Sequence, residues 1–347
     1  MNGKILVTGG AGFVGCNLVD ALLREGLDVT VFDSLVRKGT EKNLEWLQGE
    51  ARGGKLTFVK GDVRDADAVA KVTADAEVIY HLAGQVAVTT SVVDPRTDFE
   101  VNALGTLNVL EGARASGKKP AIVFTSTNKV YGECEEIPVV EQATRHAYKS
   151  APHGIDESQP LDFHSPYGCS KGAADQYIRD YGRIYDLPTV VFRMSCIYGP
   201  RQFGNEDQGW VAHFLIAAAL GRPITIYGDG KQVRDILFVE DLVRAFRTAV
   251  EKIDVTRGRI YNIGGGPSNT LSVWSEFGEL LGKLKGEPVP AKLDTWRPGD
   301  QKVYVSDIRK AEKEMGWKPQ VDKETGIRRL WDWVLASRAL FPAPEAK

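Results

Sequence analysis

The sequence predicts an α/β protein built on a doubly wound parallel sheet. Short apolar runs alternate with helical patterns from residue 4 to residue 193, and a glycine-rich turn joins the first run to the first helix. Such alternation implies right-handed β-α-β units and a sheet that helices cover on both faces. Ligands of these sheets bind at the carboxyl ends of the strands, so the chemistry is expected at that edge.

Six strands and five helices are expected in this first part of the chain. The strand candidates are 4–8, 28–33, 56–60, 77–82, 120–125 and 188–193. The helical patterns are 13–25, 41–49, 66–73, 98–116 and 167–185. Beyond Arg193 the pattern changes, and the expected elements are one more strand at 259–263 and helices near 210–220, 240–252, 270–284 and 322–337.

The composition is ordinary for a soluble globular enzyme. Of 347 residues, 43% are hydrophobic and 26% are charged, and the net charge of −2 argues against a general nucleic-acid or membrane-surface role. The four cysteines are scattered without a C-x-x-C pair, so neither a zinc site nor a disulfide framework is expected. The chain opens on a strand, and its longest clean apolar stretch, 214–220, is too short to span a bilayer. A cytoplasmic location is therefore expected.

The first turn has the composition of a phosphate-binding device. The segment Thr8-Gly9-Gly10-Ala11-Gly12-Phe13-Val14-Gly15 follows the first strand with the spacing G-x-x-G-x-x-G. Gly9 permits a tight turn, Gly12 lets the backbone approach a pyrophosphate, and Gly15 lets the helix pack close to the strand. Asp33 ends the second apolar run, where a carboxylate would bind an adenosine ribose. The alternative is a plain strand–helix turn with a solvated Asp.

Small or polar residues end the next three strands. Asp62 either accepts a hydrogen bond from an adenine amino group or caps the helix that starts near Asp65. Small residues after the fourth strand would let the backbone approach a flat cofactor, whereas His81 is expected to be a buried structural histidine. Hydroxyl groups end the fifth strand, and they either bind a substrate oxygen or cap an ordinary turn.

A tyrosine and a lysine follow a long irregular segment. Residues 133–165 are polar and lack periodicity, and a loop of this length in a compact domain is usually functional or disordered. Pro166 then opens a helix on which Tyr167 and Lys171 share a face. A neighbouring ammonium and an oxidised nicotinamide would both lower the pKa of the phenol, so Tyr167 could act as a base near neutral pH.

Two arginines in the second half of the chain are candidate clamps for an anionic ligand. Arg234 precedes an apolar run, and Arg297 lies in a loop between two expected helices. Bidentate guanidinium geometry suits a diphosphate. Taken singly, each arginine is more often a solvated surface charge.

Together these motifs resemble the extended short-chain dehydrogenase/reductase family, in its nucleotide-sugar epimerase and dehydratase branch. The likeness covers almost the whole chain and includes the motifs Tyr198-Gly199-Pro200-Arg201, Arg234-Asp235 and Arg297-Pro298-Gly299-Asp300. It implies a Rossmann NAD-binding domain at 1–193, to which the chain returns at about 234–263. It also implies a smaller α/β nucleotide-sugar-binding domain at 194–233 and 264–347, and a homodimer formed through paired helices.

The resemblance also implies roles for single residues. Tyr167 becomes the catalytic acid/base, Thr127 binds the reacting oxygen, and Lys171 holds the nicotinamide ribose. The implied NAD contacts are Gly9, Gly12, Phe13, Val14, Asp33, Asp62, Val63, Leu82, Ala83, Gly84, Asn102, Thr125, Tyr167, Lys171 and Arg193. The implied contacts to a nucleotide-diphosphate sugar are Asn128, Lys129, Gln202, Arg234 and Arg297. No metal is expected.

NAD is expected rather than NADP. The carboxylate of Asp33 would bind the ribose hydroxyls and repel a 2′-phosphate. Arg37 and Lys38 argue the other way, because a basic side chain can accommodate that phosphate.

Three stretches resemble the epimerases of this branch that invert C2 of a CDP-linked hexose through a transient keto sugar, with the hydride returned from bound NADH. They are 127–132, 160–177, and 201–203 with 207–211. The resembling dehydratases carry an Asp-Glu pair where this chain has Asn128 and Lys129, so a 4,6-dehydratase is not expected. An Asn usually stands where Cys196 is, so other residues must hold the sugar diphosphate. Two alternatives stay open: a UDP-sugar 4-epimerase, dehydratase or decarboxylase on the same scaffold, and a non-enzymatic NAD(P)-binding sensor.

Overall fold

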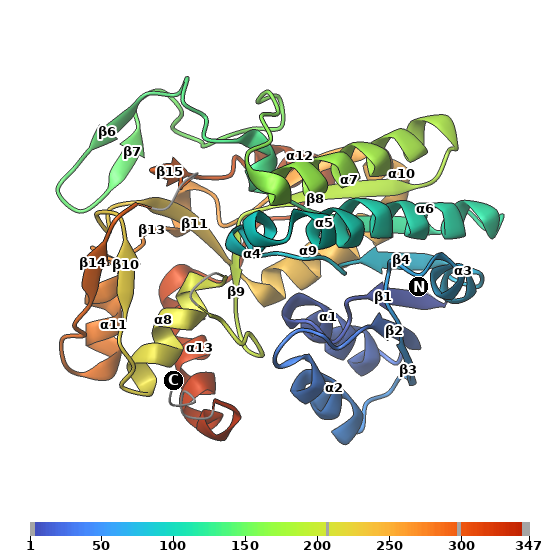
Figure 1. Cartoon of the computed structure of the whole chain (residues 1–347), viewed down its shortest axis with the longest axis horizontal. Helices are drawn as coiled ribbons and strands as arrows, with labels where there is room; N and C mark the ends of the chain where they lie inside the picture. Colours follow the sequence, from blue (N-terminus) through green and yellow to red (C-terminus); the bar gives the residue numbers. More distant parts are fainter. Residues whose placement is uncertain (1–3, 206–207, 297–299, 342–347) are drawn as a thin grey trace.

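The computed structural model describes residues 4–205, 208–296 and 300–341 (Figure 1). Its main layer is a parallel sheet of β1 (Ile5–Thr8), β2 (Val29–Asp33), β3 (Leu56–Lys60), β4 (Val78–His81), β5 (Ala121–Thr127), β8 (Thr189–Met194) and β12 (Arg259–Ile263). These strands lie in the order β12-β8-β5-β4-β1-β2-β3. All seven were expected from the sequence. The strand order reverses between β1 and β4, so a ligand is expected to bind beside the ends of those two strands.

Helices cover both faces of this sheet, because alternate residues of each strand point to opposite faces. Val7 and Val31 pack into one core layer, whereas Leu6 and Ile79 pack into the other. The first layer is covered by α1 (Phe13–Arg24), α2 (Thr40–Gly49), α9 (Val239–Glu251) and α12 (Arg309–Met315). The second is covered by α3 (Ala66–Thr73), α6 (Gly105–Ala115) and α7 (Ser165–Ile184).

The helix expected at 98–116 is divided into three pieces. After the short α4 (Val88–Val93), the chain forms α5 (Pro95–Phe99), a π-helical turn η1 (Glu100–Leu104), and then α6. Asp94 caps α5 by accepting a hydrogen bond from the backbone N–H of Thr97. The sequence pattern is continuous here, but the wider π turn re-aims a side chain, as such turns often do at functional sites.

A second, smaller layer is built around β11 (Val233–Phe238), which pairs with β9 (Cys196–Tyr198), β13 (Thr270–Ser272) and β15 (Val303–Tyr304). The helix expected at 270–284 begins only at Phe277, because Thr270–Ser272 pair with β11. The helices α8 (Trp210–Ala219), α11 (Phe277–Lys285) and α13 (Lys323–Ala336) contribute to the hydrophobic core of this smaller layer. The remaining elements are η2 (Asn128–Tyr131), β6 (Val139–Glu141), β7 (His146–Tyr148), β10 (Thr225–Tyr227), α10 (Ile253–Thr256), η3 (Pro267–Asn269), β14 (Lys292–Asp294) and η4 (Arg338–Leu340).

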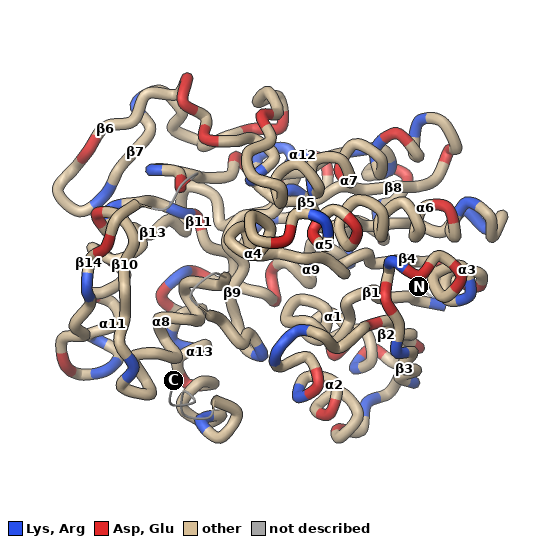
Figure 2. Tube along the Cα trace, viewed as in Figure 1, with Lys and Arg blue, Asp and Glu red and all other residues tan. Residues whose placement is uncertain are grey.

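The sheet pairings bear on how the chain is divided. Within the stretch where a return to the first domain was expected, β12 joins the main sheet but β11 joins the smaller one. The division at Arg193 stays a prediction. Figure 2 shows acidic and basic residues interspersed along the whole trace. In the described part of the chain, no helix combines the length and the apolar character that crossing a bilayer requires.

Within the irregular segment 133–165, the β6–β7 hairpin packs against the smaller layer. This hairpin extends beyond that layer at the upper left of Figure 1. Arg145 Nε lies 2.7 Å from Glu276 Oε1, and His146 Nε2 lies 2.7 Å from Asp229 Oδ2. These contacts fix the hairpin to α11 and to the turn before β11.

A buried ion pair joins α7 to β8 in the main layer. Arg193 Nε lies 2.9 Å from Asp175 Oδ2, and the two side chains are 2% and 0% exposed. Ser126 Oγ also donates to Asp175, at 2.7 Å. Breaking such a pair leaves an uncompensated buried charge, which is costly.

Replacing Arg193→Met should therefore destabilise the fold by about 3–5 kcal/mol, since the Asp175 carboxylate stays buried without its cation. The matched control is Arg24→Met, because Arg24 pairs with Asp20 at the surface and exposed pairs contribute only about 0–1 kcal/mol. Urea unfolding of both variants measures the difference. Equally small losses would contradict a stabilising role for the buried pair.

Candidate active site

The glycine turn after β1 fits a dinucleotide. Gly9 has φ 70°, and a Cβ on it would lie 2.7 Å from the backbone nitrogen of Ala83. A Cβ on Gly15 would lie 2.2 Å from the carbonyl oxygen of Gly9. Gly12 is the N-cap of α1, and among the described residues no side chain caps that end and no acidic residue lies in its first turn. The free N–H groups and the positive dipole end, where Phe13 and Val14 begin the helix, suit a pyrophosphate.

Asp33 is fixed at the end of β2 by two backbone hydrogen bonds. Its Oδ2 accepts from Ala11 N at 3.0 Å and its Oδ1 accepts from Leu35 N at 2.9 Å. Burial raises the pKa of this carboxyl group. Each oxygen keeps a further lone pair with which to accept from a ribose hydroxyl.

Asp62, at the end of β3, is held by a neighbour. Both of its oxygens accept from the Arg64 guanidinium, at 2.7–3.1 Å, and this contact lowers the pKa of the carboxyl group. The cap of α3 is Asp65, whose Oδ1 accepts from Ala68 N at 3.0 Å. Val63 is buried. Of the two roles that the sequence left open for Asp62, helix capping belongs to Asp65, and the adenine contact stays a prediction.

His81 is a structural histidine, as expected. Its Nδ1 lies 2.7 Å from Thr8 Oγ1, and its Nε2 lies 2.9 Å from Thr106 Oγ1. Burial lowers the pKa of His81 to about 3, so the ring is neutral at physiological pH. The backbone that follows is tied to β1, since Leu82 N donates to Thr8 O at 3.1 Å and Ala83 N donates to Thr8 Oγ1 at 3.3 Å.

The π turn η1 places Asn102 between β4 and α7. Asn102 Oδ1 accepts from Gln85 N at 2.9 Å, and its Nδ2 donates to Ser170 Oγ at 3.0 Å. A Cβ on Gly84 would lie 3.0 Å from Asn102 Oδ1 and 3.8 Å from Lys171 Nζ. Ser170 also donates to Asp98. Sequence reasoning missed Asp98 and Ser170, and the i,i+4 spacing of Asp98 and Asn102 was the one available signal.

Thr127, Tyr167 and Lys171 meet at the carboxyl end of β5. The Tyr167 hydroxyl is hydrogen-bonded to Thr127, and both side chains are buried. Lys171 is also buried, and its Nζ lies 4.1 Å from the centroid of the Phe124 ring. The Thr125 hydroxyl donates to the carbonyl oxygen of His81, on the neighbouring strand β4, at 3.3 Å.

In the protein without NAD, burial shifts the pKa values of both Tyr167 and Lys171 toward the neutral forms. Burial raises the pKa of Tyr167 to about 12, although Thr127 opposes the shift. Burial also lowers the pKa of Lys171 to about 7, against the carboxylates of Asp175 and Asp98. That Lys171 and a bound nicotinamide together lower the pKa of Tyr167 stays a prediction, because the raised pKa of Tyr167 applies to the protein without NAD. NAD, when bound, supplies the positive charge that would lower the phenol pKa.

Two of the predicted diphosphate contacts, Lys129 and Arg234, lie on η2 and on β11. Arg234 is buried, and its guanidinium donates to Asp300 Oδ1 and to Val233 O, each at 2.8 Å. Burial, and then Arg234, lower the pKa of Lys129, which places the two cations near each other. The Cys196 thiol faces both, and burial raises its pKa.

The other predicted substrate contacts are placed as follows. Gln202 is buried, and its Nε2 donates to Ile197 O at 3.3 Å. Asn128 Oδ1 lies 3.4 Å from Thr127 Oγ1, a long hydrogen bond. Arg297 lies outside the described residues.

Arg193, a predicted NAD contact, is hydrogen-bonded to other residues of the protein. Besides its pair with Asp175, it donates to the Tyr131 hydroxyl at 3.1 Å, and that hydroxyl donates to Asn262 Oδ1 at 2.7 Å. The NAD contact stays a prediction, whereas the contacts present are structural. Sequence reasoning missed Tyr131 and Asn262, which lie 131 residues apart.

The glycine turn, Asp33 and the Tyr167–Lys171 pair define a short-chain dehydrogenase/reductase site. Residues 6–330 match the family described as GDP-mannose 4,6 dehydratase, so the chain belongs to this family of extended short-chain dehydrogenase/reductases.

Known relatives support this assignment. The chain is 45% identical to CDP-paratose 2-epimerase of Salmonella typhi, over 95% of this chain and 99% of that protein. Its structure resembles UDP-glucose 4-epimerase of Thermotoga maritima with UDP-glucose, with a TM-score of 0.83 and 30% identity over 96% of this chain and 99% of that one. It also resembles Thermus thermophilus UDP-glucose 4-epimerase in complex with NAD, with a TM-score of 0.79 and 33% identity over the same shares. The protein is thus an enzyme of the nucleotide-sugar epimerase/dehydratase class, and its cofactor is NAD.

The pKa of Lys171 predicts a pH dependence of folding. It falls from 10.5 to about 7 in the folded protein, so between these values the unfolded chain binds a proton that the folded chain does not. The stability of the NAD-free protein should therefore rise with pH by about 1.4 kcal/mol per unit through this group.

Lys171→Met removes this titration, so its stability should rise less steeply than that of the wild type between about pH 7 and pH 9. Urea unfolding of the NAD-stripped proteins at both pH values measures the two slopes, and other titrating groups cancel in their difference. Identical slopes would show that Lys171 stays charged in the folded protein.

Proposed function

We propose that the protein inverts C2 of a CDP-linked hexose, through a transient keto sugar and return of the hydride from bound NADH. The observation that carries this proposal is the assembled trio of Thr127, Tyr167 and Lys171, in a chain 45% identical to a CDP-paratose 2-epimerase. The trio supports the oxidation and reduction of a sugar carbon. The relative supports the carbon and the nucleotide.

Each residue has a role in this reaction. The phenolate of Tyr167 takes the proton of the C2 hydroxyl and later returns it, while the Thr127 hydroxyl holds the reacting oxygen. Lys171 and Asn102, which both lie close to Gly84, would hold the nicotinamide ribose, and Asp33 would hold the adenosine ribose. NAD supplies a reversible hydride acceptor when bound. Arg234 and Lys129 would hold the diphosphate while the sugar turns over.

The residues after Thr127 support an epimerase over a dehydratase. Water loss needs an acid and a base beside the sugar, but Asn128 is an amide and Lys129 lies near Arg234. Two cations in this position fit an anionic diphosphate. The dehydratase in the family description therefore does not extend to this chain in our proposal.

A UDP-sugar 4-epimerase is the alternative. The chain is 34% identical to a putative UDP-glucose 4-epimerase of Methanocaldococcus jannaschii, over 95% of its length. The same trio serves C4 as well as C2, so only the product distinguishes the two reactions. A cytoplasmic location and a role in carbohydrate biosynthesis stay predictions.

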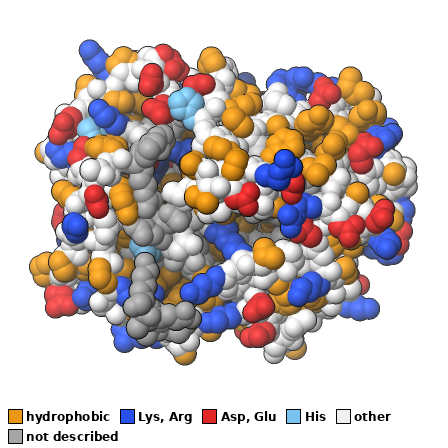
Figure 3. Space-filling model, viewed as in Figure 1, with side chains coloured by type: hydrophobic (Ala, Val, Ile, Leu, Met, Phe, Trp, Pro, Cys, Tyr) orange, Lys and Arg blue, Asp and Glu red, His pale blue; other side chains and the backbone are white. Residues whose placement is uncertain are grey.

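We also propose a homodimer formed through α5 and α7. Large apolar side chains stay exposed on these helices, and Figure 3 shows hydrophobic side chains gathering over this region at the upper right. Phe99 is 56% exposed and Tyr177 is 47% exposed. Exposed apolar patches of this kind mark association sites.

Tyr177→Glu should therefore convert the dimer to a monomer, because it places a charge in a desolvated interface. Leu293→Glu is the control, since Leu293 is 56% exposed on β14, beside the smaller layer and not on α5 or α7. Light scattering at matched concentrations measures the mass. A wild-type monomer, or a Tyr177→Glu dimer, would overturn this proposal.

The reaction is tested by incubating the protein with CDP-, UDP- and dTDP-linked hexoses in deuterated water, followed by NMR of the products. We expect inversion at C2 of a CDP-linked hexose, without solvent deuterium at that carbon, because the hydride never exchanges with water. Inversion at C4 of a UDP-hexose would establish the alternative. A 4-keto-6-deoxy product would overturn both.

Tyr167→Phe is the variant that connects this product to the site. It should lower turnover by about 10²–10⁴-fold, the usual contribution of a positioned proton-transfer group. It should still retain NAD, because the glycine turn and Asp33 are unchanged. Turnover near that of the wild type would remove Tyr167 from the mechanism.

A further inference from the structure

A four-residue segment, Pro200–Phe203, connects the smaller layer to the nucleotide turn, and we call it the strap. It follows β9, and three of its four residues contact α1, α2 and the loop between β2 and α2. Only Gln202 of this segment has a predicted role. The contacts of the other three all reach elements that surround the NAD site.

Asn17, on α1, bridges the nucleotide turn and the strap. Its Nδ2 donates to the Phe13 carbonyl at 2.8 Å and to the Pro200 carbonyl at 3.1 Å. Phe13 is the first residue of α1, whose free N–H groups face the pyrophosphate site. One amide group therefore holds the start of α1 against the strap.

Asn43, on α2, makes the equivalent bridge one residue further along. Its Nδ2 donates to the Ala11 carbonyl at 3.2 Å and to the Arg201 carbonyl at 3.3 Å, and its side chain is buried. Ala11 precedes Gly12 and also donates its N–H to Asp33. The two asparagines thus hold the carbonyl groups on both sides of Gly12.

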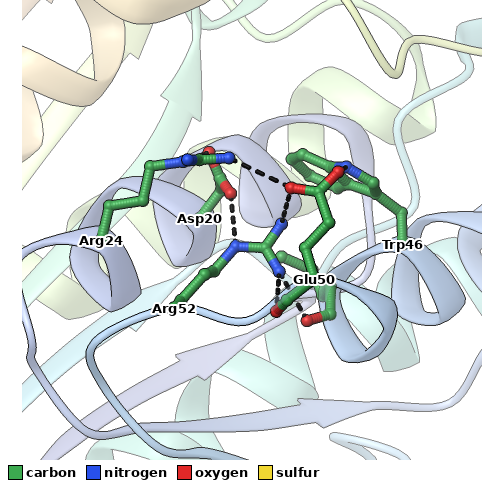
Figure 4. A network of polar contacts seen from close by, with 6 residues as sticks. Asp20, Arg24, Trp46, Glu50 and Arg52 are labelled. Atoms are coloured by element: carbon green, nitrogen blue, oxygen red, sulfur yellow. Dashed lines mark hydrogen bonds and ion pairs between the residues drawn. The ribbon is translucent and has the colours of Figure 1, made fainter.

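Arg201 holds the strap in a conformation that its own backbone disfavours. Its φ is 68°, in the left-handed region that non-glycine residues rarely adopt outside functional sites. Its guanidinium lies 4.1 Å from the ring of Trp46, on α2. Trp46 is itself fixed, because its Nε1 donates to Glu50 Oε1 at 2.7 Å and the Arg52 guanidinium stacks on its ring at 4.8 Å (Figure 4).

Phe203, the last residue of the strap, packs against the loop that follows Asp33. A Cβ on Gly39, whose φ is 92°, would lie 2.3 Å from the Phe203 ring. The same ring lies 6.4 Å from Trp333 and 5.5 Å from Phe341, which belong to the smaller layer. The loop beside the adenosine site is thereby packed against an aromatic cluster.

We propose that Asn17, Asn43, Arg201 and Phe203 are positioning residues for NAD. They fix the nucleotide turn and the loop after Asp33 around the adenosine half of the cofactor, so that NAD stays bound from one turnover to the next. This inference rests on the proposed hydride return, in which the cofactor never needs to leave. It assigns cofactor retention to residues that do not touch the reacting atoms.

The test measures release of NAD from the full-length protein, without any sugar. Wild type, Phe203→Ala and Asn17→Ala are loaded with NAD and freed of excess cofactor by rapid gel filtration. A coupled dehydrogenase then reports NAD as it appears in solution. Both strap variants should release NAD about tenfold faster, which corresponds to ~1.4 kcal/mol.

Trp274→Ala is the matched control, since its ring packs on Phe214 within the smaller layer, 5.6 Å away, and makes no ring contact with the strap. It should release NAD as slowly as the wild type. Arg201→Gly guards against misfolding, because glycine tolerates the positive φ and keeps the carbonyl that Asn43 binds. It should also release NAD faster, through loss of the contact with Trp46.

Equal release rates for the wild type and all three strap variants would overturn the inference. Equally fast release from Trp274→Ala would also overturn it, by showing that any loosening of the smaller layer frees NAD. Because no sugar is present, the outcome is independent of which carbon the enzyme inverts. A failed sugar panel with fast release from the strap variants would overturn the proposed reaction alone.

Discussion

Close backbone approach at the end of β1 is the constraint on which the rest of the structure depends. The turn leaves no space for a side chain at Gly9 or Gly15, and Gly9 N also donates to Phe32 O at 2.8 Å. The same turn contacts the backbone at Ala83 and the Asp33 carboxylate. Three strand ends therefore converge on one small segment, and the cofactor site is formed by their convergence at the switch point.

Burial of the Tyr167 and Lys171 side chains opposes their ionisation. Tyr167 and Lys171 are both shifted toward their neutral forms, because desolvation penalises each charge and neither compensates the other. In the protein without NAD, the Tyr167 phenol is therefore neutral at neutral pH, whereas Lys171 titrates close to that pH. In the proposed reaction, the positive charge of bound NAD would lower the pKa of Tyr167.

The sequence was sufficient to predict the features that depend on local order. Periodicity and spacing predict the seven strands, the glycine turn and the shared face of Tyr167 and Lys171. These patterns depend only on residues that are close together in the sequence. The contacts of Asn102 and Arg193 could not be predicted, because their partners come from elements brought together only by the fold. The pKa values of the NAD-free protein could not be predicted for the same reason, since desolvation is a property of the assembled site.

In our proposal, the cofactor and the sugar substrate are held in different ways. On the cofactor side, two asparagine amides, a guanidinium on an indole ring and an aromatic cluster attach the strap to the nucleotide turn. On the sugar side, the proposed diphosphate contacts are Lys129 on η2 and Arg234 on β11, and Arg234 also donates to Asp300. An epimerase must present both faces of a planar keto carbon to one stationary cofactor. In the proposed reaction, firm attachment of the cofactor and anchoring of the substrate mainly through its diphosphate would leave the sugar ring as the part that rotates.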